Sequence, residues 1–222
     1  MEKTIAVIFD MDGVLVNNHA FHNQAWMIFC EKYGIKISIE EIGGKFGGTN
    51  RVYLTSLFGQ LTDEQIKQYA EEKEKIYRDI YASQIQLPYG LKQLLEELQA
   101  NKIAMGVATS GILPNVDFVL DHTGIRKYFK CIIDDSMVSK GKPDPEIFLI
   151  AAKKIGAEPS RCVIFEDSQV GIQAGLNAGI KVIGITSTNP AEKIKHATCV
   201  INSFTEVNLD KIKNLIFNHN LK

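Results

Sequence analysis

Short apolar runs, rich in β-branched residues, recur along the chain and alternate with stretches whose pattern is typical of helices. Near-continuous runs of this kind are typical of strands in a parallel sheet that helices cover on both faces. The sequence therefore predicts an α/β fold with a doubly wound, mostly parallel, Rossmann-like sheet. The runs are IAVIF (5–9), IAMGVAT (103–109), CIIDD (131–135), CVIFED (162–167), KVIGIT (181–186) and TCVI (198–201).

One long region after the first run contains no strand-like pattern and reads as successive helices. Thr62 is followed three residues later by Gln65, which is the capping-box pattern of a helix start. Gly34 and Gly59 are placed to end two of the helices. The helices are expected at residues 19–34, 51–59 and 62–83.

These helices predict a second domain inserted into the first. We expect an all-helical cap domain at residues 17–83 and a core α/β domain formed by residues 1–16 and 84–222. Pro88 and Gly90 mark the return of the chain to the core. Two short connections between two compact parts are suited to act as a hinge.

Composition narrows the classes of partner. The formal net charge is −1, from 25 basic and 26 acidic residues, which argues against a nucleic-acid or membrane-surface partner. No apolar stretch approaches the roughly 20 residues of a membrane helix, and the N-terminus does not resemble a signal peptide.

Widely spaced cysteines indicate free thiols in a cytoplasmic protein, and the absence of an apolar heptad favours a monomer. The cysteines are Cys30, Cys131, Cys162 and Cys199.

Polar side chains stand at the carboxyl ends of the predicted strands, where α/β sheets bind their ligands. Asp10 and Asp12 follow the first strand and point to the same side of an extended chain, and Gly13 then permits a turn. Taken alone, this pair is a weak signal, and an acidic turn after a strand explains it better. Asp134 stands at another such end.

Glu166 and Asp167 follow a later strand and change the interpretation of the first pair. Together with Asp10 they would supply the hard oxygen ligands that Mg²⁺ prefers. The alternative is a helix N-cap, because Asp167 or Ser168 could cap the Gly- and Ala-rich helix that follows.

Two further strand or helix ends carry residues suited to phosphate. Thr109, Ser110 and Gly111 offer hydroxyls and backbone N–H groups at a strand-to-helix turn, either as an anion site or as an ordinary cap. Lys142 precedes Pro143 in a segment that we expect to be extended before it enters a helix. A lysine there would neutralise a nucleophile and hold a phosphoryl oxygen. The set as a whole is suited to phosphoryl transfer through an aspartyl-phosphate.

Four stretches resemble the four motifs of the haloacid dehalogenase superfamily of phosphotransferases, in the same order and over nearly the whole chain. The β-phosphoglucomutase-like branch, which carries a helical cap after the first strand, is the most similar. The stretches are FDMDGVL, VATSG, GKPDPEIF and FEDSQVGIQA.

The resemblance implies a role for each core residue. Asp10 would be the nucleophile and Asp12 the general acid/base, and Lys142 would bridge nucleophile and phosphate. Mg²⁺ would be held by Asp10, the backbone carbonyl of Asp12 and Asp167, with Glu166 close by. Phosphate would be bound by Thr109 and Ser110 together with Gly111.

The chain departs from the family pattern at Asn17, where many relatives carry an aspartate. The asparagine keeps the hydrogen-bonding shape and loses the charge at the expected hinge. The presence of Asp12 argues against dehalogenase chemistry, which needs no acid/base at that position in this family.

The cap residues would select the substrate. By resemblance, His22 could approach the acid/base, and Arg51 and Lys73 match residues that hold a second phosphate in sugar-phosphate mutases. Lys73 lies in a charged run that we expect to be mostly solvated. Asn115, in contrast, is similar to a residue of broad phosphatases.

We therefore expect a Mg²⁺-dependent phosphatase that acts on small phosphorylated metabolites such as sugar phosphates. The alternative is a β-phosphoglucomutase-type sugar-phosphate mutase. A phosphoacceptor signalling module of the receiver type uses similar residues, but such a module is shorter and has no helical cap.

Overall fold

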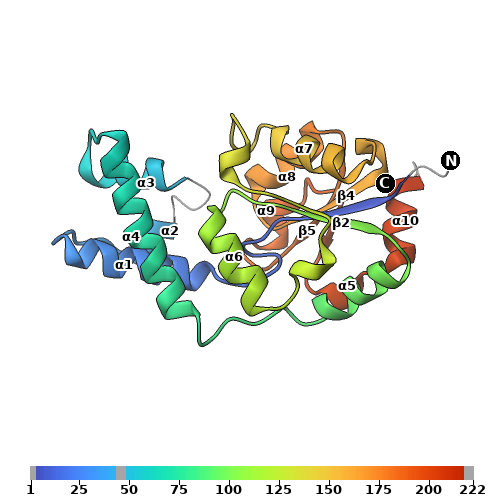
Figure 1. Cartoon of the computed structure of the whole chain (residues 1–222), viewed down its shortest axis with the longest axis horizontal. Helices are drawn as coiled ribbons and strands as arrows, with labels where there is room; N and C mark the ends of the chain where they lie inside the picture. The colour runs from blue at the N-terminus through green and yellow to red at the C-terminus, as the bar shows by residue number, and fades with distance from the viewer. Residues whose placement is uncertain (1–3, 44–48, 218–222) are drawn as a thin grey trace. The chain divides into compact units, whose positions relative to one another are not determined.

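The computed structural model describes residues 4–43 and 49–217, and its larger part is a six-stranded parallel sheet (Figure 1). The strand order is β3-β2-β1-β4-β5-β6, so the chain runs outward from β1 in both directions, as in a doubly wound sheet. This confirms the predicted α/β fold and all six predicted strands. The strands are β1 (Ala6–Phe9), β2 (Ala104–Ala108), β3 (Cys131–Ile133), β4 (Cys162–Glu166), β5 (Lys181–Ile185) and β6 (Cys199–Ile201).

Helices lie on both faces of this sheet, with α7 and α8 on one face and α5 and α10 on the other (Figure 1). Short 3-10 helices occupy several connections, at Arg126–Tyr128, Asp135–Met137, Pro159–Arg161 and Phe204–Glu206. The α-helices of this part are α5 (Leu91–Ala100), α6 (Leu113–His122), α7 (Glu146–Ile155), α8 (Gln169–Asn177), α9 (Ala191–Ile194) and α10 (Leu209–Phe217).

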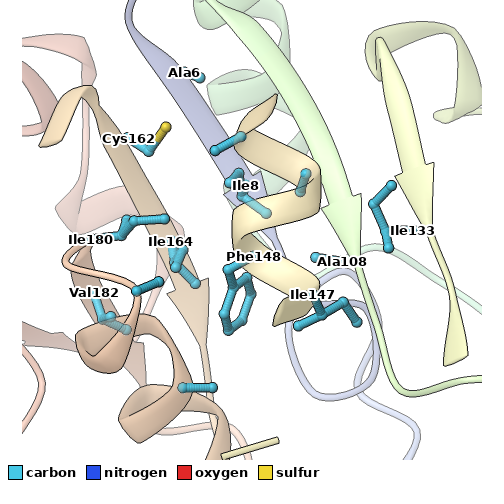
Figure 2. Close-up of a cluster of buried hydrophobic side chains, with 14 of the residues drawn as sticks. Ala6, Ile8, Ala108, Ile133, Ile147, Phe148, Cys162, Ile164, Ile180 and Val182 are labelled. Atoms are coloured by element: carbon cyan, nitrogen blue, oxygen red, sulfur yellow. The ribbon is translucent and has the colours of Figure 1, made fainter. Parts of the chain in front are cut away.

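Alternation along the strands sends side chains to both faces, which explains why the runs are apolar throughout. Ile8 and Ile164 point toward α7, where Phe148 is fully buried (Figure 2). Phe9 and Phe165, one residue further along their strands, stack on each other with ring centroids 5.0 Å apart. β1 and β4 pair with Ile8 opposite Ile164 and Phe9 opposite Phe165, so their carboxyl ends lie at the same edge of the sheet.

The chain divides into two compact units, Met1–Asn17 with Gln86–Lys222, and Asn18–Ile85. The expected domain boundaries differ from these by one or two residues. The second unit is helical and has its own aromatic-rich core, which includes Trp26, Phe29 and Tyr53. Its helices are α1 (His19–Lys32), α2 (Ile39–Gly43), α3 (Asn50–Phe58) and α4 (Asp63–Tyr81).

The local signals of the helical unit correspond to observed helix ends. The Thr62 hydroxyl accepts from the Gln65 backbone N–H, and the Gln65 side chain accepts from the Thr62 N–H, so the capping box is present. Gly59 follows α3 with a positive φ of 76°, which a glycine adopts without strain. The short helix α2 was not predicted, because five residues are too few to show a period.

Two other expectations concern the whole chain. All four cysteines are free in the structure, as predicted from their spacing. No helix within the described residues combines the length and the apolar character that a membrane span requires.

Replacing Thr62 by alanine removes the hydroxyl half of the capping box, and we expect the free energy of unfolding to fall by about 1 kcal/mol. Thr62→Ser is the matched control because it keeps the hydroxyl. Equilibrium unfolding in urea measures both variants. Equal midpoints for the alanine and serine variants would contradict the assigned cap.

Candidate active site

Asp10 directly follows β1 at the centre of the sheet. Its backbone N–H donates to the Phe165 carbonyl of β4 at 3.0 Å, so the ladder extends one residue beyond the strand and positions this carboxylate. The side chain is buried, and its Oδ1 lies 2.7 Å from the Lys142 Nζ.

The groups around Asp10 shift its pKa in opposite directions. Burial raises the pKa of this carboxyl well above its usual range, the Lys142 ammonium lowers it, and the carboxylates of Glu166 and Asp167 raise it again. The lysine is therefore the main group that favours the ionised form, which is the form that can act as a nucleophile.

Lys142 reaches this position from a turn, and not from the extended segment expected from the sequence. The Asp144 N–H donates to the Gly141 carbonyl at 3.1 Å, which closes the turn ahead of α7. The Lys142 ammonium donates to Asp10 at 2.7 Å and to the Glu166 Oε1 at 2.6 Å. Burial alone would lower the pKa of Lys142, but these two carboxylates outweigh it and raise the pKa above its usual value.

Glu166 is the last residue of β4 and is held from two sides. Its Oε2 accepts from the Ser168 backbone N–H at 2.7 Å and from the Ser168 hydroxyl at 3.0 Å. Ser168 also caps α8, since its Oγ accepts from the Gly171 N–H. The sequence left Asp167 and Ser168 open as caps, and the structure assigns the cap to Ser168.

Gly171 gives Glu166 the space it occupies. A Cβ added at this position would lie 1.7 Å from the Glu166 Oε1 and 2.1 Å from its carboxyl carbon. No side chain other than hydrogen is compatible with this carboxylate position.

The loop after β5 supports the site and was not singled out from the sequence. The Thr188 hydroxyl donates to the Asp167 Oδ2, and the Asn189 side-chain amide donates to the Asp167 carbonyl at 3.1 Å. Ser187 donates from its hydroxyl to the Gly13 carbonyl, in the turn that carries Asp12. The signal was a run of polar residues, TSTN, directly after a buried strand whose carboxyl end lies at the same edge.

The turn after β2 brings a hydroxyl and Asp12 together. Thr109 is buried, and its Oγ1 accepts from the Gly111 N–H at 3.0 Å. A Cβ on Gly111 would lie 3.2 Å from this oxygen and 3.5 Å from the Asp12 Oδ2. Ser110 is exposed in the turn, and Asn115 is buried in the first turn of α6. This hydrogen bond holds the backbone of Gly111 against the Thr109 hydroxyl within the turn.

Asp134, at the carboxyl end of β3, has a local role. Its Oδ1 accepts from the Ser136 backbone N–H at 2.8 Å and from the Ser136 hydroxyl at 2.6 Å. This aspartate caps the 3-10 helix that follows β3.

The carboxylates at the sheet edge fit a divalent cation. Asp10, Glu166 and Asp167 are buried, and one oxygen of each lies within 4.8 Å of the others. A single lysine faces three carboxylates, which leaves an excess of buried negative charge that a cation would compensate. Hard oxygen donors of this kind suit Mg²⁺.

The residues predicted to select the substrate from the cap domain all lie in the helical unit, and two of them are in contact. The Lys73 Nζ is 2.9 Å from the His22 Nδ1, whereas Arg51 is exposed and pairs with Asp63 at 2.7 Å. The expectation that Lys73 faces solvent is wrong: its side chain is 2% exposed. Trp26, whose ring lies 5.1 Å from the Lys73 Nζ, belongs to the unit's core.

A parallel sheet with a nucleophile-type aspartate, a lysine and a metal-type carboxylate cluster at its carboxyl edge defines a phosphoryl-transfer class of enzyme. The family model for the haloacid dehalogenase-like hydrolases matches residues 7–185. The chain belongs to this family of enzymes, as the four sequence motifs predicted.

Several proteins resemble this chain over most of their length. A crystal structure of a family IA, variant 3 haloacid dehalogenase-type hydrolase from Entamoeba histolytica is 32% identical, with a TM-score of 0.91 over 97% of this chain and 100% of that one. The phosphorylated carbohydrates phosphatase of Thermotoga maritima is 30% identical over 88% of this chain and 92% of that protein. The β-phosphoglucomutase of Bacillus subtilis is 30% identical over 83% of this chain and 84% of that protein.

Gly171→Ala should displace the Glu166 carboxylate, because the added Cβ occupies its position. We expect Mg²⁺ binding, measured by isothermal titration calorimetry, to weaken roughly 10- to 100-fold, as for the loss of groups that orient metal ligands. Gln173→Ala, an exposed change in the same helix, is the control. Unchanged Mg²⁺ affinity in the Gly171 variant would show that Glu166 is not needed at the metal.

Proposed function

We propose that the protein is a Mg²⁺-dependent phosphatase of small phosphorylated metabolites such as sugar phosphates. The observation that carries this proposal is the 2.7 Å contact between Asp10 and Lys142, at a strand end that also holds Asp12. The similarity to the Thermotoga maritima phosphatase of phosphorylated carbohydrates supports the substrate class.

Asp10 and Asp12 divide the chemistry between them. In the first step an Asp10 carboxylate oxygen attacks phosphorus, the bond from phosphorus to the leaving oxygen breaks, and Asp12 donates a proton to that oxygen. In the second step Asp12 takes a proton from water, the water oxygen attacks phosphorus, and the bond to Asp10 breaks. Inorganic phosphate leaves, and both aspartates return to their starting state.

The remaining core residues bind the phosphoryl group and compensate its negative charge. Lys142 offsets the charge of the Asp10 carboxylate and contacts a phosphoryl oxygen, which lowers the repulsion between the two anions. Thr109, Ser110 and Gly111 line the phosphate, with Asn115 in the helix that follows. Mg²⁺ would be held by Asp10, the Asp12 backbone carbonyl, Asp167 and Glu166, and when bound it neutralises charge on the phosphoryl group.

A sugar-phosphate mutase of the β-phosphoglucomutase type is the second candidate. The similarity to the Bacillus subtilis enzyme favours it. In that reaction a sugar hydroxyl replaces water as the acceptor, and Arg51 and Lys73 would hold a second phosphate. A receiver-type signalling module is disfavoured by the helical unit of residues 18–85.

We also propose that the protein acts as a monomer in the cytoplasm on small soluble metabolites, without nucleic-acid or membrane partners. The balanced charge supports the absence of such partners, and the free thiols support a reducing compartment.

Asp10→Asn should abolish phosphate release from sugar phosphates, because the amide keeps the shape but is not a nucleophile. Asp12→Asn should slow it by roughly 10²- to 10⁴-fold through the loss of proton transfer. Release of inorganic phosphate in the presence of Mg²⁺ is the measurement, with the exposed Asp210→Asn as control. Residual activity of the Asp10 variant close to wild type would exclude an aspartyl-phosphate.

The identity of the product shows whether water or a sugar hydroxyl accepts the phosphoryl group. With β-glucose 1-phosphate, Mg²⁺ and a trace of glucose 1,6-bisphosphate, a phosphatase should release inorganic phosphate and form no glucose 6-phosphate. Phosphate detection and an enzyme-coupled assay for glucose 6-phosphate measure both products. Glucose 6-phosphate without free phosphate would establish the mutase.

A further inference from the structure

Three consecutive residues of the loop after β5 reach two different parts of the site at the sheet edge. The Ser187 hydroxyl donates to the Gly13 carbonyl, in the turn after β1. The Thr188 hydroxyl donates to the Asp167 Oδ2, and the Asn189 side-chain amide donates to the Asp167 carbonyl at 3.1 Å. The loop therefore holds this buried aspartate both at its side chain and at its backbone.

The loop itself is fixed on both sides of Thr188. At its start, the Thr186 backbone N–H donates to the Ile201 carbonyl at 3.0 Å, directly beyond the pairing of β5 with β6. At its end, Pro190 leads into α9. Thr188 is half-buried between these two anchors, so the position of its hydroxyl is determined by the fold of the sheet unit.

The kind of donor matters for Asp167. Lys142 donates to Asp10 at 2.7 Å and to Glu166 at 2.6 Å, and it brings a positive charge to both carboxylates. A hydroxyl donates a hydrogen bond without a formal charge. Thr188 can therefore orient the Asp167 carboxylate without neutralising it, and the negative charge stays available to a cation. Groups that orient a metal ligand in this way typically contribute roughly 10- to 100-fold to metal affinity.

The restraint on Asp167 also affects which cation is favoured. Mg²⁺ requires near-ideal octahedral geometry, whereas Ca²⁺ accepts more ligands, longer distances and bidentate carboxylates. A carboxylate that can turn adapts to the demands of Ca²⁺. A carboxylate that is held at one oxygen by a hydroxyl, and at its backbone by an amide, adapts less. Fixing Asp167 therefore favours the ion with the stricter geometry.

We propose that Thr188 is a positioning residue of the metal site, which holds Asp167 in place for Mg²⁺ and thereby disfavours Ca²⁺. The inference rests on the proposed function, which places the ion at Asp10, Glu166 and Asp167. It deepens that function by assigning the choice of ion to a neutral hydroxyl outside the carboxylate cluster.

Isothermal titration calorimetry of Mg²⁺ and of Ca²⁺ into the metal-free protein measures both affinities without turnover. Thr188→Val replaces the hydroxyl by a methyl group of similar size. We expect the Mg²⁺ affinity to fall roughly tenfold and the Ca²⁺ affinity to change by roughly threefold or less, because Ca²⁺ tolerates a mobile carboxylate. Thr188→Ser keeps the hydroxyl and should retain both wild-type affinities.

Thr186→Val is the matched control, because it makes the same exchange two residues earlier in the loop. Its hydroxyl donates to the Asn202 Oδ1 at 2.9 Å in an exposed position, and the substitution keeps the backbone anchor to β6. Both affinities should stay unchanged in this variant. Thr188→Ala provides the same comparison as Thr188→Val if the valine variant does not fold.

The ratio of the two affinities decides the outcome. An unchanged ratio in a folded Thr188→Val or Thr188→Ala protein would overturn the inference, and so would a wild-type protein that binds Ca²⁺ as tightly as Mg²⁺. A wild-type protein that binds no Mg²⁺ would overturn both the inference and the proposed metal dependence. A protein whose Mg²⁺ affinity depends on Thr188 as expected, but which releases no phosphate from any substrate, would contradict the proposed phosphatase function alone.

Discussion

The two buried hydrogen bonds from Lys142 are the interaction on which the site at the sheet edge depends. The ammonium bridges Asp10 and Glu166, which come from neighbouring strands. Buried carboxylates repel one another and are costly to desolvate, so the pair is stable only with a cation between them. The lysine supplies that cation from the turn ahead of α7, and so connects the charge balance of the site to the packing of the helix that covers this face.

Much of this arrangement follows from features that a sequence displays. The strands were predictable because both faces of a parallel sheet are covered, which makes each run apolar throughout. Asp10, Thr109 and Glu166 could be grouped because each stands at or just after the carboxyl end of such a run. Parallel strands in register bring those ends to one edge, so proximity in space follows from position within each run.

Other features depend on contacts between distant segments and were not predictable. Lys73 lies among charged neighbours, a pattern that suggests solvent, yet Trp26 of another helix packs against it. The support that Thr188 gives to Asp167 lies in a loop without a motif of its own. The short helix α2 is a different case. Ser38 and Glu41 have the spacing of a capping box and form its reciprocal hydrogen bonds, but the helix is too short to show a hydrophobic period.

The two lysine clusters of the chain differ in a way that bears on function. At the sheet edge one lysine faces three carboxylates, so the cluster retains a negative charge and attracts a further cation. In the helical unit Lys73 forms a buried ion pair with Glu74 at 2.9 Å. A phosphoryl dianion needs excess positive charge, which a metal bound at the sheet edge would supply. The charge requirement of a phosphoryl group therefore links Lys142 and the buried carboxylates of the sheet edge to a bound cation, because neither the lysine nor the carboxylates alone provide the positive charge that the dianion needs.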